Sequence, residues 1–114
     1  QRGGEAMHLP LIEIVPATNT QELISAITEA WSFDWIVFTS ANGVDHFCRQ
    51  LQLLHRDPRA LGTAQLAAIG PATAAALENH GLVCDLIPDR WLSEGFVAAF
   101  NQSREKKRFL LIQA

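Results

Sequence analysis

The chain has 114 residues, of which 48% are hydrophobic and 18% are charged, and its formal net charge at pH 7 is −3. This length fits one domain, and the apolar content is too high and the net charge too small for a disordered segment. No apolar run approaches the ~20 residues that cross a bilayer. Nine Lys and Arg against twelve Asp and Glu leave no cationic surplus to neutralise phosphates. We therefore expect neither a membrane nor a nucleic acid as a partner.

The cysteines and histidines carry no recognisable site. Cys48 and Cys84 lie far apart, inside apolar patterns and without a CxxC spacing. We expect two buried free thiols in a reducing compartment, and hence a cytoplasmic protein. The four histidines form no HExxH motif and no ladder with cysteine, so nothing in the spacing asks for a metal site.

Strand and helix patterns alternate along the chain with short connections. Short apolar runs predict five strands, at residues 8–16, 34–40, 65–70, 84–88 and 108–114. Apolar residues at helical spacing predict four helices, one after each of the first four strands. This alternation predicts an α/β fold with a doubly wound parallel sheet of about five strands and helices on both faces.

Local signals fix several of the predicted boundaries. Asn19 with Glu22 three residues later is typical of a capped helix start. Pro71 at the first position and Gly81 just beyond the end frame a helix over residues 72–80. We expect Trp35 to be largely buried against a covering helix. In the first predicted helix, apolar residues recur at helical spacing at Leu23, Ile24, Ile27, Ala30 and Trp31.

Three strand-to-helix turns are small and polar, and parallel sheets bind ligands at the edge where such turns lie. The three turns contain Thr39, Ser40 and Asn42; Gly70 and Thr73; and Ser93 and Glu94. Each set has a plain alternative, since these side chains also cap helices or complement the helix dipole. Together they favour an anion-binding rim that uses N–H and hydroxyl donors, with almost no fixed positive charge.

Several common chemistries do not fit the sequence. The turn at Gly70 is not a GxGxxG motif, and no P-loop or GxSxG motif is present. A phosphoacceptor receiver domain needs an aspartate at a strand end, whereas Asp34 and Asp85 stand at predicted strand starts.

Taken in order, these segments resemble uroporphyrinogen-III synthases over nearly the whole chain. The resemblance is carried by Trp35-Ile-Val-Phe-Thr-Ser-Ala-Asn-Gly-Val44, by Ala67-Ala-Ile-Gly-Pro-Ala-Thr-Ala-Ala-Ala-Leu77 followed by Gly81, and by Ser93-Glu94. The segment from His8 to Pro16 resembles the one by which that family's chain crosses between its two flavodoxin-like domains. The resemblance implies that residues 1–16 are a helix end and interdomain connector strand, that residues 17–114 are a truncated flavodoxin-like domain, and that the second domain is absent.

The resemblance also implies an activity. The family is a cyclising lyase of porphyrin and haem biosynthesis, which closes hydroxymethylbilane with loss of water and inversion of ring D to give uroporphyrinogen III. No metal or organic cofactor takes part, and the full-length enzyme is expected to be a monomer. The match carries substrate binding over to Thr39, Ser40, Asn42, Gly70, Thr73, Ser93 and Glu94. The family's candidate for assisting loss of the hydroxyl is a tyrosine; this chain has none, so we expect the catalytic residue outside it and the chain alone to be inactive.

Two other classes of function remain open from the residues alone. One is a non-catalytic flavodoxin-like module that binds a small anionic ligand, in which Thr18-Asn-Thr20 would correspond to a flavin phosphate loop. The other is a structural or interaction domain whose polar turns only cap helices.

Overall fold

The computed structural model describes residues 11–56, 58–88 and 108–113. Within them strands and helices alternate, as the sequence pattern predicts. The elements are β1 (Leu11–Pro16), α1 (Thr20–Thr28), η2 (Ala30–Ser32), β2 (Trp35–Phe38), α2 (Ala41–Leu53), η3 (Pro58–Leu61), β3 (Gln65–Ala68), α3 (Pro71–Asn79) and β4 (Arg108–Gln113), where η denotes a short 3-10 helix.

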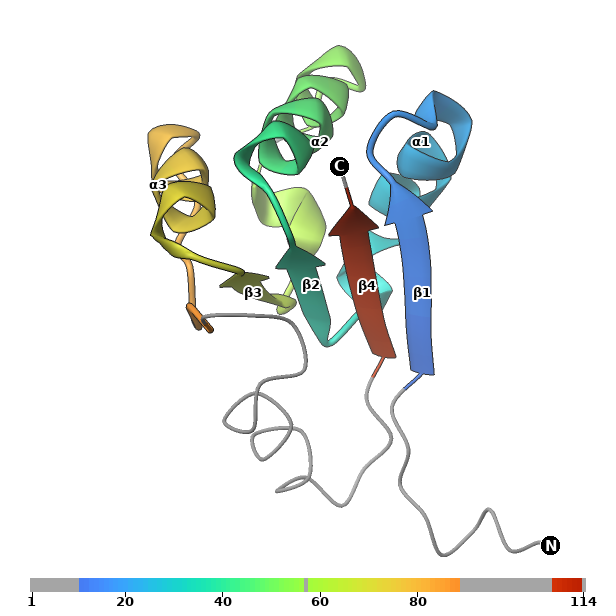
Figure 1. The fold of residues 1–114 in the computed structure, drawn as a ribbon. Coiled ribbons are helices and arrows are strands. Elements are labelled where there is room, and N and C mark those ends of the chain that lie inside the picture. Colours follow the sequence, from blue (N-terminus) through green and yellow to red (C-terminus); the bar gives the residue numbers. More distant parts are fainter. Residues whose placement is uncertain (1–10, 57, 89–107, 114) are drawn as a thin grey trace, which may run out of the picture.

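The described strands form one parallel sheet in the order β1-β4-β2-β3 (Figure 1). The last strand is inserted between the first two, with Phe109 opposite both Ile12 and Trp35. A single parallel bridge joins Ala67 to Leu86, on the far side of β3. If the segment at Leu86 is counted as the fourth strand and β4 as the fifth, the order across the sheet is 1-5-2-3-4. This order is a cyclic shift of the flavodoxin-like arrangement 2-1-3-4-5. The predicted fold class is confirmed.

The strand predicted at residues 84–88 is reduced to that one bridge. Ala68 N donates to Leu86 O at 3.0 Å and Gly70 N donates to Pro88 O at 3.0 Å, as in a parallel ladder. Two ladder positions are lost, however. Leu66 N donates to the Asp85 carboxylate at 2.8 Å instead of to a backbone carbonyl, and Pro88 has no N–H to return. The prediction of five full strands is therefore not met in the described residues.

Local chemistry favours the start of each α-helix and the end of α3. The Asn19 side chain accepts from Glu22 N at 3.1 Å and starts α1, as predicted. Ser40 Oγ accepts from Gly43 N at 3.0 Å and starts α2. Pro71 opens α3, and Gly81 follows its end with φ of 79°. None of the helices in the described part of the chain has the length and hydropathy of a membrane-spanning segment.

The three α-helices lie on one face of the sheet (Figure 1). Alternate strand residues, such as Phe38 and Ile112, point to this face and form the main core with the helices. Phe38 packs edge-on against Phe47 of α2, with ring centroids 5.2 Å apart. The main helix contributions to this core are Leu23, Ala26 and Ile27 of α1, Val44, Phe47, Cys48 and Leu51 of α2, and Ala74 and Leu77 of α3.

The opposite face of the sheet is also apolar. Val37, Ala67, Phe109 and Leu111 are buried there as a second cluster. The helix expected to start near Ser93 lies outside the described residues. Helices on both faces, and the division of the chain at residue 16 into connector and domain, stay predictions.

Two tryptophans are less buried than the sequence pattern predicts. Trp31 is 64% exposed, because α1 ends at Thr28 and the 3-10 helix η2 breaks the helical spacing before it. Trp35 is only partly buried, against the second cluster rather than under one of the described helices. The large buried aromatic of this region is Phe33, which is 3% exposed.

Backbone and side-chain contacts of Asp34 fix the amino edge of the sheet. Its carboxylate accepts from Arg108 N at 2.8 Å, and its own N–H donates to Arg108 O at 2.9 Å. The Arg108 guanidinium lies 4.4 Å from the centre of the Phe33 ring and donates to Ser32 Oγ at 2.6 Å. Asp34 therefore holds the start of β4 in register beside β2. Its place at a strand start agrees with the argument against a receiver domain.

We predict that Asp34→Ala lowers the free energy of unfolding by about 1–3 kcal/mol, because the N–H of Arg108 loses its acceptor. Asp34→Asn keeps an oxygen in the same place and should cost clearly less. Urea denaturation of both variants measures the difference, and equal losses would contradict this role of the side chain.

Candidate functional site

The carboxyl ends of the four strands lie along one edge of the sheet (Figure 1). There β2 leads through Thr39 and Ser40 into α2, and β3 leads through Ile69 and Gly70 into α3. In the flavodoxin-like order, the topological switch point lies between the two strands that correspond here to β4 and β2. Open α/β sheets bind ligands beyond such a point, so the first polar turn stands where a site is expected.

Thr39 ties this turn to the end of β4. Its N–H donates to Ile112 O at 3.2 Å, and its hydroxyl lies 3.3 Å from the same oxygen as a second donor. A hydroxyl has one proton to donate, and that of Thr39 is already used inside the protein. Thr39 therefore positions the turn rather than offering a free donor to an anion.

Ser40 and Asn42 keep donors available. Ser40 Oγ accepts from Gly43 N, which leaves its own proton without an acceptor among the described residues. The Asn42 side chain is exposed in the first turn of α2. The turn packs closely on β4, and a Cβ at Gly43 would lie 3.5 Å from Ile112 Cγ2, which is an ordinary van der Waals contact. Ser40 thus caps α2 with its oxygen, as the plain alternative predicts, while its hydroxyl hydrogen stays free for a ligand.

The second turn presents a helix start without a cap. Gly70 is the N-cap of α3, with φ 87° and ψ 158°, and makes no side-chain hydrogen bond. Pro71 has no N–H, and Ala74 N donates to Gly70 O at 3.2 Å. The N–H groups of Ala72 and Thr73 therefore have no intrahelical acceptor. Free N–H groups at the positive end of the helix dipole favour an anion.

Thr73 adds an unusual polar group to this helix start. The residue is only 4% exposed, yet its hydroxyl has no hydrogen-bond partner among the residues that the structure describes. A buried hydroxyl without a partner costs about 1–3 kcal/mol. Thr73 does not close its own first turn by a side-chain bond, so the plain capping alternative does not explain it.

The two cysteines add no further chemistry, and Ser93 and Glu94 lie outside the described residues. Burial and the nearby Asp45 raise the pKa of the Cys48 thiol to about 11, and burial raises the pKa of the Cys84 thiol. Cys84 is only partly buried, contrary to expectation, and its sulfur lies 3.2 Å from Leu86 O. Both thiols stay protonated near neutral pH, so neither is an activated nucleophile. No group of metal-binding side chains occurs in residues 11–56, 58–88 and 108–113.

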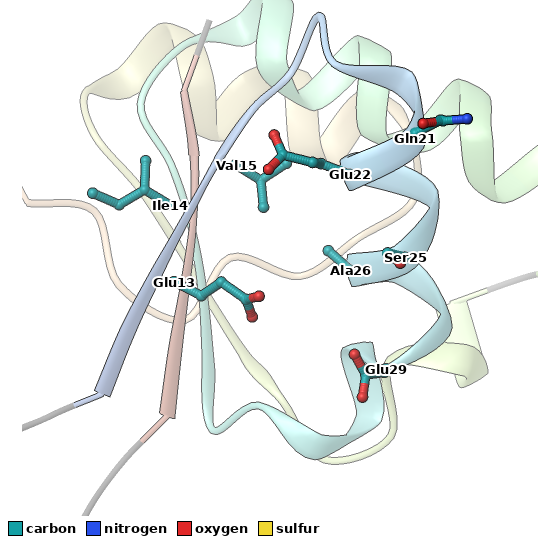
Figure 2. A pocket seen from close by; sticks show the side chains of 8 residues that line it. All are labelled: Glu13, Ile14, Val15, Gln21, Glu22, Ser25, Ala26 and Glu29. Atoms are coloured by element: carbon teal, nitrogen blue, oxygen red, sulfur yellow. The ribbon is translucent and has the colours of Figure 1, made fainter.

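A hollow of about 410 Å³ lies between β1 and α1 and was not predicted by any sequence motif. Figure 2 shows Glu13, Glu22 and Glu29 around it, while Ile14 points to the other side of β1. Three carboxylates on one hollow repel anions, so this groove does not suit the ligand class that the rim favours. No sequence motif indicated this hollow, because Glu13 comes from β1 whereas Glu22 and Glu29 come from the two ends of α1.

Comparison with known proteins identifies relatives of this chain. The family model described as "Uroporphyrinogen-III synthase HemD" matches residues 1–114. The "Porphyrin biosynthesis protein HemD" of Ruminiclostridium josui is 34% identical over 89 residues, which are 78% of this chain and 18% of that protein. The "Uroporphyrinogen-III synthase" of Synechococcus elongatus is 30% identical over 108 residues, 95% of this chain and 40% of that protein. No solved structure matches the chain.

A third relative gives the same result. The "Putative uroporphyrinogen-III synthase" of Methanothermobacter thermautotrophicus is 31% identical over 103 residues, which are 87% of this chain and 38% of that protein. The chain thus spans between 18 and 40% of the length of these curated relatives.

The backbone conformation of Gly70 in the second turn leads to a testable prediction. Gly70→Ala should lower the free energy of unfolding by about 1–3 kcal/mol, because its φ and ψ suit only glycine. No steric clash contributes, since a Cβ at Gly70 would meet nothing within 4 Å.

Gly43→Ala is the matched control. Its Cβ would lie 3.4 Å from Ser40 Oγ, an ordinary contact, and it has no positive φ. The higher helix propensity of alanine should keep its stability within about 0.5 kcal/mol of the wild type or above it. Urea denaturation compares the two variants; a Gly70→Ala protein as stable as Gly43→Ala would rule out backbone strain at Gly70.

Proposed function

The chain belongs to the uroporphyrinogen-III synthase family, and we propose that it forms most of one domain of such an enzyme and one wall of its substrate cleft. The substrate in this proposal is the linear tetrapyrrole hydroxymethylbilane, and the reaction closes it with loss of water and inversion of ring D to give uroporphyrinogen III. No metal or organic cofactor is part of the proposed reaction. The proposal includes a cytoplasmic enzyme that is monomeric in its full-length form.

The observation that carries the proposal is the start of α3. Gly70 leaves the first-turn N–H groups of this helix without a cap, and the buried hydroxyl of Thr73 stands in the same turn. The substrate presents acetate and propionate groups, and carboxylates are acceptors that suit N–H and O–H donors. This helix start therefore offers a place for one substrate carboxylate.

The turn after β2 supports the same assignment. Ser40 and Asn42 offer donors on the neighbouring strand end, while Thr39 holds the turn against β4. We assign Ser40, Asn42, Gly70 and Thr73 to binding the substrate, Thr39 to positioning the turn, and Ser93 and Glu94 to the same rim. Donors fixed on the ends of rigid strands hold a flexible linear substrate in one shape, which is catalysis by positioning.

The flavin-type alternative is not favoured by the strand order. Thr18-Asn-Thr20 follows β1, which is the edge strand of the sheet. The switch point lies one strand further in, between β4 and β2, and a flavodoxin-like phosphate loop would have to follow β4. The family relationship likewise points to tetrapyrrole chemistry rather than to a flavin module.

Thr73→Val tests the central residue of the proposal. Since the hydroxyl has no partner in the described structure, the variant should be at least as stable as the wild type. Binding of uroporphyrin III, a stable octacarboxylate, to the 114-residue chain should weaken about ten- to hundredfold, because a hydrogen bond to a charged group is lost. In an enzyme that contains this chain, turnover should fall roughly 10²-fold.

Thr63→Val is the control, because Thr63 is exposed in the turn that precedes β3, at the opposite edge of the sheet. It should leave uroporphyrin III binding unchanged. A Thr73→Val chain that binds normally and melts at a lower temperature would show that the hydroxyl serves folding only.

We also predict that the chain alone does not convert hydroxymethylbilane. It contains no tyrosine, and in this proposal it supplies only one wall of the cleft. Chromatographic separation of the type I and type III isomers measures the outcome. Type III product above the spontaneous type I background would overturn this division of the active site.

A further inference from the structure

A second polar hollow lies on α2, next to the turn of the proposed site. It has a volume of about 240 Å³ and is lined by Asn42, Asp45, His46 and Arg49. These residues recur at helical spacing and share the side of α2 that faces away from the core, opposite Val44 and Leu51. The hollow therefore begins at the rim, where Asn42 stands, and continues along the outer side of the helix.

Arg49 is placed to act at the rim although it is not in the turn itself. It follows Asn42 by two helical turns, about 11 Å along the axis. Side chains of an α-helix lean toward its N-terminus, and the N-terminus of α2 is at the rim. This general tendency favours an Arg49 side chain that leans along the hollow toward the polar turn, and the hollow that it lines begins at Asn42.

The charges around the hollow leave this guanidinium available. Arg49 has no ion pair among the described residues. The acid of the hollow, Asp45, accepts from His80 Nε2 at 3.0 Å, across from α2 to the end of α3. The carboxylate of Asp45 is therefore held by a neighbouring helix, while the guanidinium of Arg49 keeps its donors available to a ligand.

We infer that Arg49, together with His46 and Asn42, binds a peripheral carboxylate of the substrate. This inference rests on the proposed function. A tetrapyrrole with eight carboxylates presents more acceptors than the neutral donors of Ser40 and Thr73 can satisfy. The planar fork of an arginine matches a carboxylate with two parallel hydrogen bonds, and a cation beside the rim draws a polyanion toward it.

Arg49→Gln in the 114-residue chain tests the inference, with uroporphyrin III as the probe. Titration of its fluorescence at low salt should show binding weakened about three- to tenfold, as expected for an exposed charged pair. The affinity of the variant should also depend less on salt, since one ion contact is lost. Arg49→Lys should lie between the variant and the wild type.

Arg56→Gln is the matched control. Arg56 is also exposed and has no side-chain partner among the described residues, but it follows the C-terminal end of α2 at the other edge of the sheet. It should bind uroporphyrin III as the wild type does. Equal weakening in both variants would mean general attraction by positive charge and would overturn the Arg49 subsite.

The outcomes separate this inference from the proposed function. Normal binding by Arg49→Gln, with weakened binding by Thr73→Val, overturns the Arg49 subsite and leaves the proposed function standing. No binding of uroporphyrin III by the wild-type chain overturns both.

Discussion

The position of β4 between β1 and β2 is the constraint on which the rest of the structure depends. The last strand of the chain pairs with the first along six residues and with the second along four, and its apolar residues are buried on both faces of the sheet. Asp34 holds its start against β2, and the Thr39 turn holds its end. Without β4 the first strand would have no described neighbour, and the switch point beside the first polar turn would not exist.

This insertion explains how the first two polar turns come to lie side by side at one edge of the sheet. Thr39 uses both of its donors on Ile112 of β4, so the turn after β2 is fixed by a strand that is 73 residues away in sequence. With the turn fixed, the Ser40 hydroxyl and the start of α3 lie on neighbouring strand ends. The long-range ladder supplies the rigidity, and the local turns supply the donors.

The sequence predicts the local part of this arrangement well and the long-range part poorly. The spacing of apolar residues predicted the α/β class. The capping residues Asn19, Pro71 and Gly81 predicted the start of α1 and both ends of α3, because each of them acts on its own neighbours in the sequence. The insertion of β4 leaves no local trace. Trp31 was misplaced because helical spacing does not reveal that α1 ends at Thr28. The strand at residues 84–88 was overestimated because its failure depends on Asp85 and Pro88 meeting β3.

The same limit applies to the candidate site. Motif spacing selected Ser40, Asn42, Gly70 and Thr73 as candidates, but it could not tell a capping hydroxyl from a free one. Only the structure shows that Ser40 caps with its oxygen while Thr73 caps nothing. Arg49 was not predicted, because the sequence gives no sign that an exposed arginine in α2 lies near the polar turn that precedes this helix.

Gly70 shows how the backbone leaves the start of α3 uncapped. A Ser, Thr, Asp or Asn at this N-cap would satisfy one first-turn N–H group of α3 and stabilise the helix by roughly a few tenths of a kcal/mol relative to glycine. The φ of 87° is one that those residues rarely adopt. The backbone conformation therefore selects glycine, and glycine leaves the helix start uncapped. Local stability is thus lower at the point where donors for a ligand are free, and the buried ladder between β2 and β4 offsets that loss.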